Sequence, residues 1–192
     1  DYMKRVSLKP LEVSDAGEVY ELCRGTFREE YHIAEERILG SLFEDPDFSA
    51  EESKKIVDEK NGRMVGFVGV KVSHNEQLYP ASAWISIFAV KKEEQGKGYG
   101  TMVLNQVCQS LHKNGINKIY VGQDFNNFFS GIPDPDEGKE IFFKKNGFTL
   151  NRDRHFDLEA DITDNRLIDS FDTSSFDKEF TVASYKDNKK EL

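Results

Sequence analysis

The residues of this sequence best suited to chemistry are the three glycines of the stretch Gln95-Gly96-Lys97-Gly98-Tyr99-Gly100. Glycine has no side chain, so the backbone can approach a bulky anion and adopt the positive φ angles that turn several N–H groups toward it. A helical pattern begins directly after the loop, and a helix N-terminus adds unpaired N–H groups and a positive dipole end. Lys97, with Lys91 or Lys92, can add charge at the rim. The stretch therefore predicts a binding site for phosphate groups.

Two other phosphate-binding motifs do not fit this stretch. A P-loop requires Lys and then Ser or Thr after its last glycine, whereas Gly100 is followed by Thr101 and Met102. A dinucleotide-binding motif requires glycine at its sixth position, which is Thr101 when counted from Gly96, and an acidic residue at the end of the next strand. That strand ends at Val121-Gly122-Gln123, without an acid.

The segments on either side of the loop have the patterns of a buried strand and an amphipathic helix. The run 81–90 is apolar and carries no charge, which predicts a central strand. In 98–112 the apolar residues Val103, Val107 and Leu111 recur at four-residue steps, which predicts a helix that packs on the sheet. Upstream, Asn61-Gly62 between Lys54–Glu59 and Arg63–Val72 predicts an antiparallel hairpin.

The remaining patterns complete an α/β class with a central mixed sheet and helices on both faces. Ser14 is expected to cap the first helix. The other predicted elements are, in order, a strand over 6–11, helices over 15–27 and 30–42, a strand over 117–122, a helix over 136–146 and a final strand over 148–158.

Val90 followed by Gln95–Gly100 resembles the Gln-x-x-Gly-x-Gly signature of the GNAT acetyltransferase superfamily. Ile141–Phe148 is similar to the late helix of that family and its Gly-Phe turn into a strand. In element order the resemblance covers 6–158. It implies the GNAT-like acyltransferase fold, acetyl-coenzyme A as cosubstrate, and transfer of the acetyl group to a primary amine of a small molecule or a protein.

The resemblance also implies which residues hold the donor. Backbone amides of the loop would bind the pyrophosphate, and the end of the preceding strand would bind the pantetheine arm through its main chain. The implied donor site consists of Phe88, Ala89, Val90, Gln95, Gly96, Lys97, Gly98, Tyr99, Gly100, Thr101 and Phe143.

The residues that would catalyse the transfer are not identified by the sequence. Many relatives carry a Tyr acid where this chain has Phe143, and a Glu that orders a water base where it has Ser86. A thiolate can leave without protonation by the enzyme, so direct attack by a bound neutral amine is retained. The other groups considered, none of them assigned over a solvated loop or cap position, are Asp124, Ser130, Glu29, Glu30 and Tyr31.

Composition narrows the classes of partner. With 26 Lys and Arg against 35 Asp and Glu, the formal charge of −9 disfavours nucleic acid and anionic membranes. Cys23 and Cys108 lie in apolar-periodic segments, which suits reduced thiols in a cytoplasmic protein. The four histidines, His32, His74, His112 and His155, have no metal-binding spacing, so no metal site is expected. Phe125, Phe128 and Phe129 are expected to be a wall of the core or of the acceptor cleft.

The chain is expected to comprise a GNAT-like domain over 5–158 and an acidic segment over 159–192. That segment is either a linker or tail, or the start of a second related domain, because 180–192 faintly resembles the opening strand. A homodimer and a tandem second domain are therefore the two assemblies considered. Because of Phe143 and Ser86, the alternative function is a non-catalytic module that binds acyl-coenzyme A for regulation or structure. A domain that binds no ligand ranks last.

Overall fold

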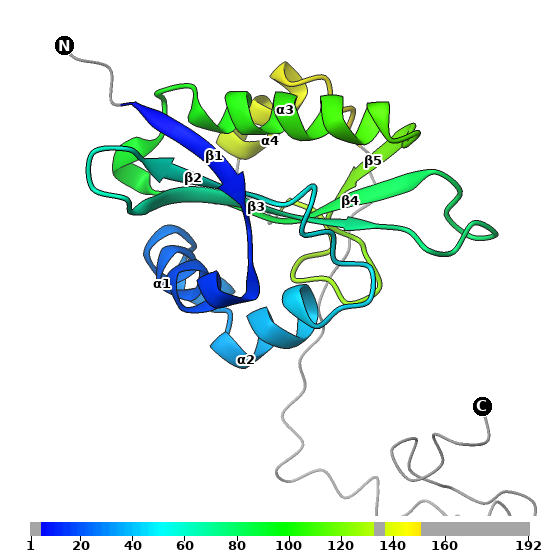
Figure 1. Ribbon diagram of the computed structural model, residues 1–192, viewed down its shortest axis with the longest axis horizontal. Coiled ribbons are helices and arrows are strands. Elements are labelled where there is room, and N and C mark those ends of the chain that lie inside the picture. The colour runs from blue at the N-terminus through cyan, green and yellow to red at the C-terminus, as the bar shows by residue number, and fades with distance from the viewer. Residues whose placement is uncertain (1–4, 133–136, 151–192) are drawn as a thin grey trace, which may run out of the picture. The chain divides into compact units, whose positions relative to one another are not determined.

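The structure is a computed structural model that describes residues 5–132 and 137–150, all within one compact unit, Asp1–Asp153. A five-stranded sheet has the order β1-β2-β3-β4-β5 (Figure 1). Its strands are β1 (Val6–Pro10), β2 (Lys54–Asp58), β3 (Met64–Val72), β4 (Ser82–Val90) and β5 (Lys118–Val121). The pairs β1–β2, β2–β3 and β3–β4 are antiparallel, and β5 pairs in parallel with β4. The sheet is therefore mixed, as predicted.

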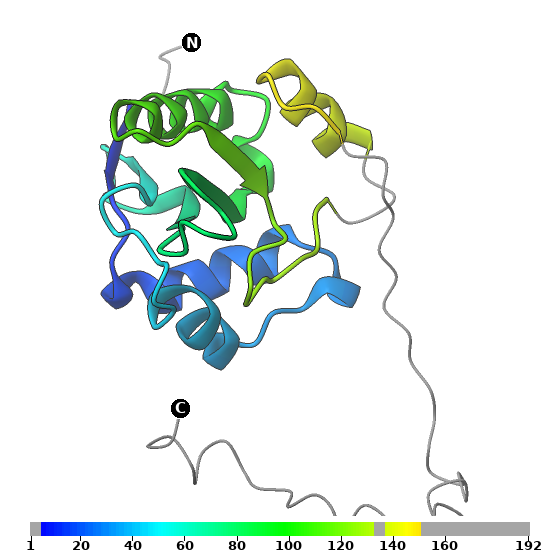
Figure 2. The ribbon, with the colours of Figure 1, turned by 90° about the vertical axis from the view of Figure 1, so that its right-hand side faces the viewer.

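Helices cover both faces of this sheet. α1 (Ala16–Thr26), α2 (Glu35–Ile38) and η3 (Leu39–Phe43) lie on one face, and α3 (Tyr99–Lys113) and α4 (Glu137–Lys145) on the other (Figures 1 and 2). Each pair of layers encloses a core, because both sides of the middle strands are apolar. The α1-side core is centred on Val19, Leu22, Ile38, Leu42 and Phe67, and the α3-side core on Val68, Ile85, Val103, Val107 and Leu111.

The predicted hairpin and the helix after the glycine loop are confirmed. Gly62 in the hairpin turn has φ +71°, a conformation that only glycine adopts without strain. α3 buries Val103, Val107 and Leu111 on one face, as their spacing predicted. β4 is an interior strand between β3 and β5.

Three predictions need correction or fall outside the described residues. Ser14 does not cap α1, because it lies inside η1 (Val13–Asp15), where the Glu12 N–H donates to the Asp15 carboxylate over 2.9 Å. The helix predicted from residue 30 starts at Glu35, after the short turn η2 (Glu29–Tyr31), and continues as the π-helix η3. Residues 148–150 form no strand, and the rest of the predicted final strand lies outside the described residues, as does the 159–192 segment.

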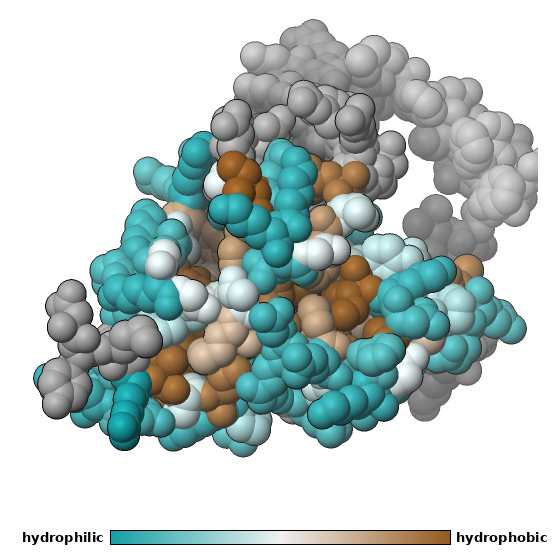
Figure 3. Space-filling model, turned by 90° about the horizontal axis from the view of Figure 1, so that it is seen from above, coloured by the Kyte–Doolittle hydropathy of each residue, from teal (hydrophilic) through white to brown (hydrophobic). Residues whose placement is uncertain are grey.

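The surface above α3 and α4 is mostly hydrophilic, with hydrophobic side chains gathered in patches (Figure 3). In the part of the chain that the structure describes, no helix combines the length and apolar composition that crossing a bilayer requires.

Candidate active site

The glycine loop leads from β4 into α3 and contains two left-handed glycines, which are separated by Lys97. Gly96 has φ +74° and Gly98 has φ +84°, and a Cβ added at either would meet nothing within 4 Å. Gly98 is the N-cap of α3, and no side chain caps the helix. The first-turn N–H groups of a helix have no acceptor within the helix itself, which is the arrangement that favours an anion.

Two side chains of the loop contact residues that precede it. The Gln95 Nε2 amide donates to the Val90 carbonyl over 2.9 Å, which fixes the start of the loop on the end of β4. Lys97 Nζ lies 3.0 Å from the buried carboxylate of Glu94, and its own side chain is half-exposed. This contact directs the ammonium group toward the loop but shares its charge with Glu94.

Near the middle of β4 two changes coincide: a β-bulge interrupts its pairing with β3, and its pairing with β5 on the other edge ends. Gly69 of β3 pairs with Ile87 and Val70 with Ile85, so Ser86 is an extra residue. The pairing of β5 with β4 ends at Ile85, although the Gly122 N–H still donates to the Ile85 carbonyl over 2.9 Å. Beyond this point no other described strand pairs with β4 on that edge.

Backbone groups of β4 therefore face an unpaired edge beside the loop, where the Val90 carbonyl already accepts from Gln95. The Lys91 N–H donates to Val65 of β3, so by alternation the N–H and C=O groups of Val90 and Phe88 face the opposite, open edge. This is where a flexible, amide-containing arm could bind in extended form.

Aromatic rings from β4 and α4 meet the first turn of α3 at Gly100. The Phe88 and Phe142 rings stack with centroids 5.6 Å apart, and a Cβ at Gly100 would lie 3.1–3.2 Å from both. Phe143 is 6% exposed, and its ring packs edge-on against Phe88, Phe142 and Phe148. Phe142, not Phe143, thus lies against Gly100 of the glycine loop.

A second loop, residues 122–132, follows β5 on the side of α1 and α2 (Figure 2). It begins with two left-handed residues, Gly122 at φ +66° and Gln123 at φ +64°. A Cβ at Gly122 would collide with the Phe129 carbonyl and lie 2.9 Å from the Gly131 nitrogen, so only glycine fits. Gln123 is strained, because a non-glycine residue adopts this conformation at a cost.

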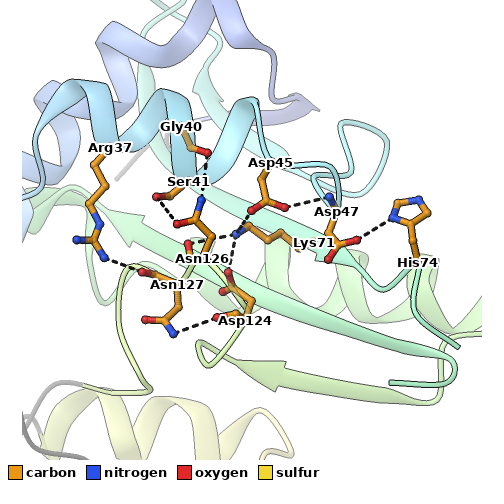
Figure 4. A network of polar contacts seen from close by, with 10 residues as sticks. All are labelled: Arg37, Gly40, Ser41, Asp45, Asp47, Lys71, His74, Asp124, Asn126 and Asn127. Carbon is orange, nitrogen blue, oxygen red and sulfur yellow. Dashed lines mark hydrogen bonds and ion pairs between the residues drawn. The ribbon is translucent and has the colours of Figure 1, made fainter. Parts of the chain in front are cut away.

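Lys71 of β3 anchors this loop from inside the protein. Its side chain is 1% exposed, and Nζ lies 2.5 Å from the Asp124 Oδ1 and 3.0 Å from the Asp45 Oδ2 (Figure 4). Nζ also approaches the Asn126 carbonyl over 3.4 Å. A buried ammonium group needs such compensation, because desolvation of an unpaired charge is costly.

The same loop is tied to α2 and η3 by amide contacts. The Asn126 side chain accepts from Ser41 Oγ over 3.2 Å and donates to the Gly40 carbonyl over 3.2 Å. Arg37 Nη2 donates to the Asn127 carbonyl over 2.8 Å. The loop is thus fixed on one helical layer rather than extending into solvent.

The predicted acceptor residues are distributed over this region. Phe129 meets Phe27 and Tyr31 edge-on, with centroids 5.4 and 5.9 Å apart, whereas Phe128 is buried in the core and Phe125 is 70% exposed. The α4 residue Lys139 places Nζ 5.7 Å from the ring of Phe27, the residue that follows α1. The side chains of Glu29, Glu30 and Ser130 are exposed.

Both cysteines are free, and burial raises the pKa of Cys23 to about 12 and also raises the pKa of the half-buried Cys108. Neither is an activated nucleophile, because only the thiolate attacks. Across residues 5–132 and 137–150 no group of three His, Cys, Asp or Glu could hold a metal ion. His32, His74 and His112 are exposed, and His155 lies outside these residues.

The sequence interpretation missed Lys71 and Asp45. Lys71 interrupts an apolar strand between Val70 and Val72, and a charge in a strand buried on both faces needs a partner. That signal predicts a buried ion pair but not its partners, since Asp124 is 53 residues away.

The chain belongs to the acetyltransferase (GNAT) family, whose model matches residues 16–130. It is therefore a transferase of the acyltransferase class. A search of the curated proteins returned no match.

Solved structures of several acetyltransferases share the fold. One is described as a GCN5-related glucosamine N-acetyltransferase region in a fungal multi-domain GH3 beta-N-acetylglucosaminidase, with TM-score 0.68 and 22% identity. The match covers 78% of this chain and 18% of that one, so this chain spans less than a fifth of that protein.

Two others are matched over most of their length. The ribosomal-protein-S18-alanine N-acetyltransferase from Escherichia coli has TM-score 0.59 and 15% identity, with 76% of this chain and 78% of that one covered. AAC(6')-Iy, in complex with the bisubstrate analog CoA-S-monomethyl-acetylneamine, has TM-score 0.59 and 9% identity, with 81% and 99% covered. At these identities the likeness concerns the fold.

Proposed function

We propose that this protein transfers an acetyl group from acetyl-coenzyme A to a primary amine. The single observation that carries the proposal is the pair of left-handed glycines, Gly96 and Gly98, at the uncapped N-terminus of α3. Open space at both Cβ positions suits pyrophosphate oxygens bound by backbone N–H groups. The open edge of β4 and the family membership support the same donor.

In this proposal each predicted donor residue has a stated task. N–H groups from Gly96 to Thr101 bind the pyrophosphate, Gln95 fixes the loop, and Lys97 adds positive charge. The main chain of Phe88, Ala89 and Val90 borders the pantetheine arm, with Phe88 and Val90 facing it. The buried Phe143 and the partly buried Tyr99 border the same region through packing.

Protonation of the leaving thiolate does not depend on Phe143. Its ring lies in the core and has no proton to give. A thiol is far more acidic than an alcohol, so the thiolate leaves without an acid. The acceptor side then has to supply a place for the amine beside the unpaired edge of β4.

Two measurements test the proposal in order. Calorimetric titration with acetyl-coenzyme A should give binding. The matched ligand is S-acetylpantetheine, which lacks the pyrophosphate and should bind at least tenfold more weakly. No binding at millimolar acetyl-coenzyme A would refute the donor site and also the alternative of a non-catalytic binding module.

Release of free thiol then separates the enzyme from that module. The panel should include glucosamine, an aminoglycoside and a peptide with N-terminal alanine, because similar structures are described with such acceptors. Binding without thiol release above the rate of spontaneous hydrolysis would favour the module.

A cytoplasmic location and a GNAT-like domain over 5–158 are parts of the same proposal, supported by the free thiols and the family match.

A further inference from the structure

One oxygen of a buried carboxylate in loop 122–132 has no partner. The Asp124 side chain is 2% exposed, its Oδ1 is paired with Lys71, and its Oδ2 accepts no hydrogen bond within the described residues. The other carboxylate on Lys71 differs in this respect. Asp45 accepts from Lys71 with Oδ2 and from the Asp47 N–H with Oδ1, over 3.0 Å each, so both of its oxygens are satisfied.

Anchoring the loop does not explain this arrangement. Two carboxylates share one ammonium group, so the cluster keeps an excess negative charge, and an unpaired oxygen in a buried site is costly. The strained Gln123 directly precedes Asp124, which adds a backbone cost. Backbone strain at Gln123 and an unpaired oxygen at Asp124 both cost stability. Two such costs at adjacent residues point to a hydrogen-bond donor that binds Asp124 from outside the chain.

The position of Asp124 fits an acceptor amine. It lies three residues beyond Val121, the last residue of β5 paired with β4, and thus where the two strands part. Ser86 lies at the same point on β4, and its Oγ is likewise buried and unpartnered. Ser86 is the bulge residue between Ile85, which packs in the α3-side core, and Ile87, which packs in the α1-side core.

We propose that Asp124 is the base for the acceptor amine, an assignment that rests on the proposed function. An acceptor that arrives as an ammonium ion gives one proton to Asp124 Oδ2, directly or through one water. The neutral nitrogen then attacks the acetyl carbonyl carbon, so that a C–N bond forms and the C–S bond breaks. The second nitrogen proton passes to the leaving thiolate, and Asp124 releases its proton to water. The products are the amide, the free thiol and one proton.

Lys71 is the positioning residue in this scheme. Its contact with Oδ1 orients the carboxylate and leaves Oδ2 free for the acceptor. The scheme also accounts for Phe143, because the proton that a Tyr would deliver comes from the amine itself.

The test compares Asp124→Asn with Asp45→Asn in the full chain. Each variant removes the negative charge of one carboxylate that pairs with Lys71, and keeps the shape of that side chain. The nucleophiles are glucosamine and ethylamine, which are protonated at pH 7, and hydroxylamine, which is neutral there and needs no base before attack. Thiol release is measured with each, beside the melting temperature and the affinity for acetyl-coenzyme A.

Asp124→Asn should lose about 100-fold or more in rate with the protonated amine that the unmodified chain uses best. With hydroxylamine the loss should stay within about tenfold. Asp45→Asn should keep its rate within a few-fold for every nucleophile, and both variants should bind acetyl-coenzyme A as the unmodified chain does.

Equal losses in the two variants, or equal losses of Asp124→Asn with all nucleophiles, would overturn the assignment and leave a structural role. If the unmodified chain binds acetyl-coenzyme A but uses no nucleophile, the catalytic part of the proposed function fails and this inference fails with it. A chain active with amines and unaffected by Asp124→Asn would refute the inference alone.

Discussion

Replacing Gly98 by glutamate is the sharpest perturbation of the donor site. At φ +84° any side chain costs about 1 kcal/mol of stability, because the left-handed conformation brings Cβ close to the carbonyl. A carboxylate at this position also adds a negative charge at the uncapped start of α3. Two unit charges 4 Å apart near a protein surface interact by about 4 kcal/mol. Affinity for a pyrophosphate should therefore fall about a thousandfold.

The backbone contribution can be separated from the charge with two control variants. Gly98→Ala keeps the strain without the charge and should weaken binding by at most about tenfold. Gly62→Ala carries a matching strain at φ +71°, again with no atom within 4 Å of the added Cβ, but lies in the β2–β3 turn. It should lose about 1 kcal/mol of stability and bind acetyl-coenzyme A normally.

Calorimetric titration with acetyl-coenzyme A measures all three variants beside the unmodified chain, and thermal unfolding reports their stability. Unchanged affinity in Gly98→Glu would refute the assignment of the loop as the pyrophosphate site. A loss in Gly62→Ala as large as that in Gly98→Ala would show that strain, and not position, controls binding.

Four other predictions concern buried residues. Phe143→Tyr should leave the rate of thiol release within about twofold, because the new hydroxyl would lie among aromatic rings. The same buried hydroxyl should lower the free energy of unfolding by about 1–3 kcal/mol. A tenfold faster thiol release would contradict the burial. Gly122→Ala should destabilise the protein by more than the 1 kcal/mol of a left-handed alanine, since its Cβ collides with Phe129, and a smaller loss in urea unfolding would count against the loop structure. Cys23, with a pKa of about 12 against 9.0 unperturbed, should stay unmodified by thiol reagents at pH 8, where Cys108 reacts more slowly than in urea. Because the folded pKa of Cys23 is raised, its stabilisation is fully present below pH 9.0 and is lost as pH rises toward 12, which unfolding of Cys23→Ala at both ends of this window would check.

The donor side could be predicted from the sequence because its determinants are local. Strand β4, the glycine loop and α3 follow one another within 82–113, and each has a pattern set by near neighbours. Glycine spacing predicts the loop conformation, and Gly96 and Gly98 adopt it. The roles of these residues toward a bound donor stay predictions.

The acceptor side could not be predicted in the same way, because its contacts join distant segments. Asp124 was a candidate because it follows a strand. Its proposed role as a base, however, depends on its contact with Lys71 and on its second oxygen, which has no donor. Ser86 was recognised as a departure from the family pattern, yet the bulge that displaces it depends on the register against β3. Ser14 was expected to cap α1 by its residue type, but it lies inside the turn η1, and the N-cap residue of α1, Asp15, makes no side-chain capping hydrogen bond to the helix.

This difference between local and distant contacts bears on how the protein opens. The contacts that hold loop 122–132 close chain segments of 53, 86 and 90 residues, whereas Gln95 reaches Val90 over five. Closing a longer chain segment costs more conformational entropy, and proteins open locally in contiguous cooperative units. Hydrogen exchange should therefore show the 122–132 segment detaching as a unit while the β4–α3 segment stays protected. A detached loop would expose Lys71 with the donor half intact, so an enzyme that has lost its acceptor side could still hold acetyl-coenzyme A.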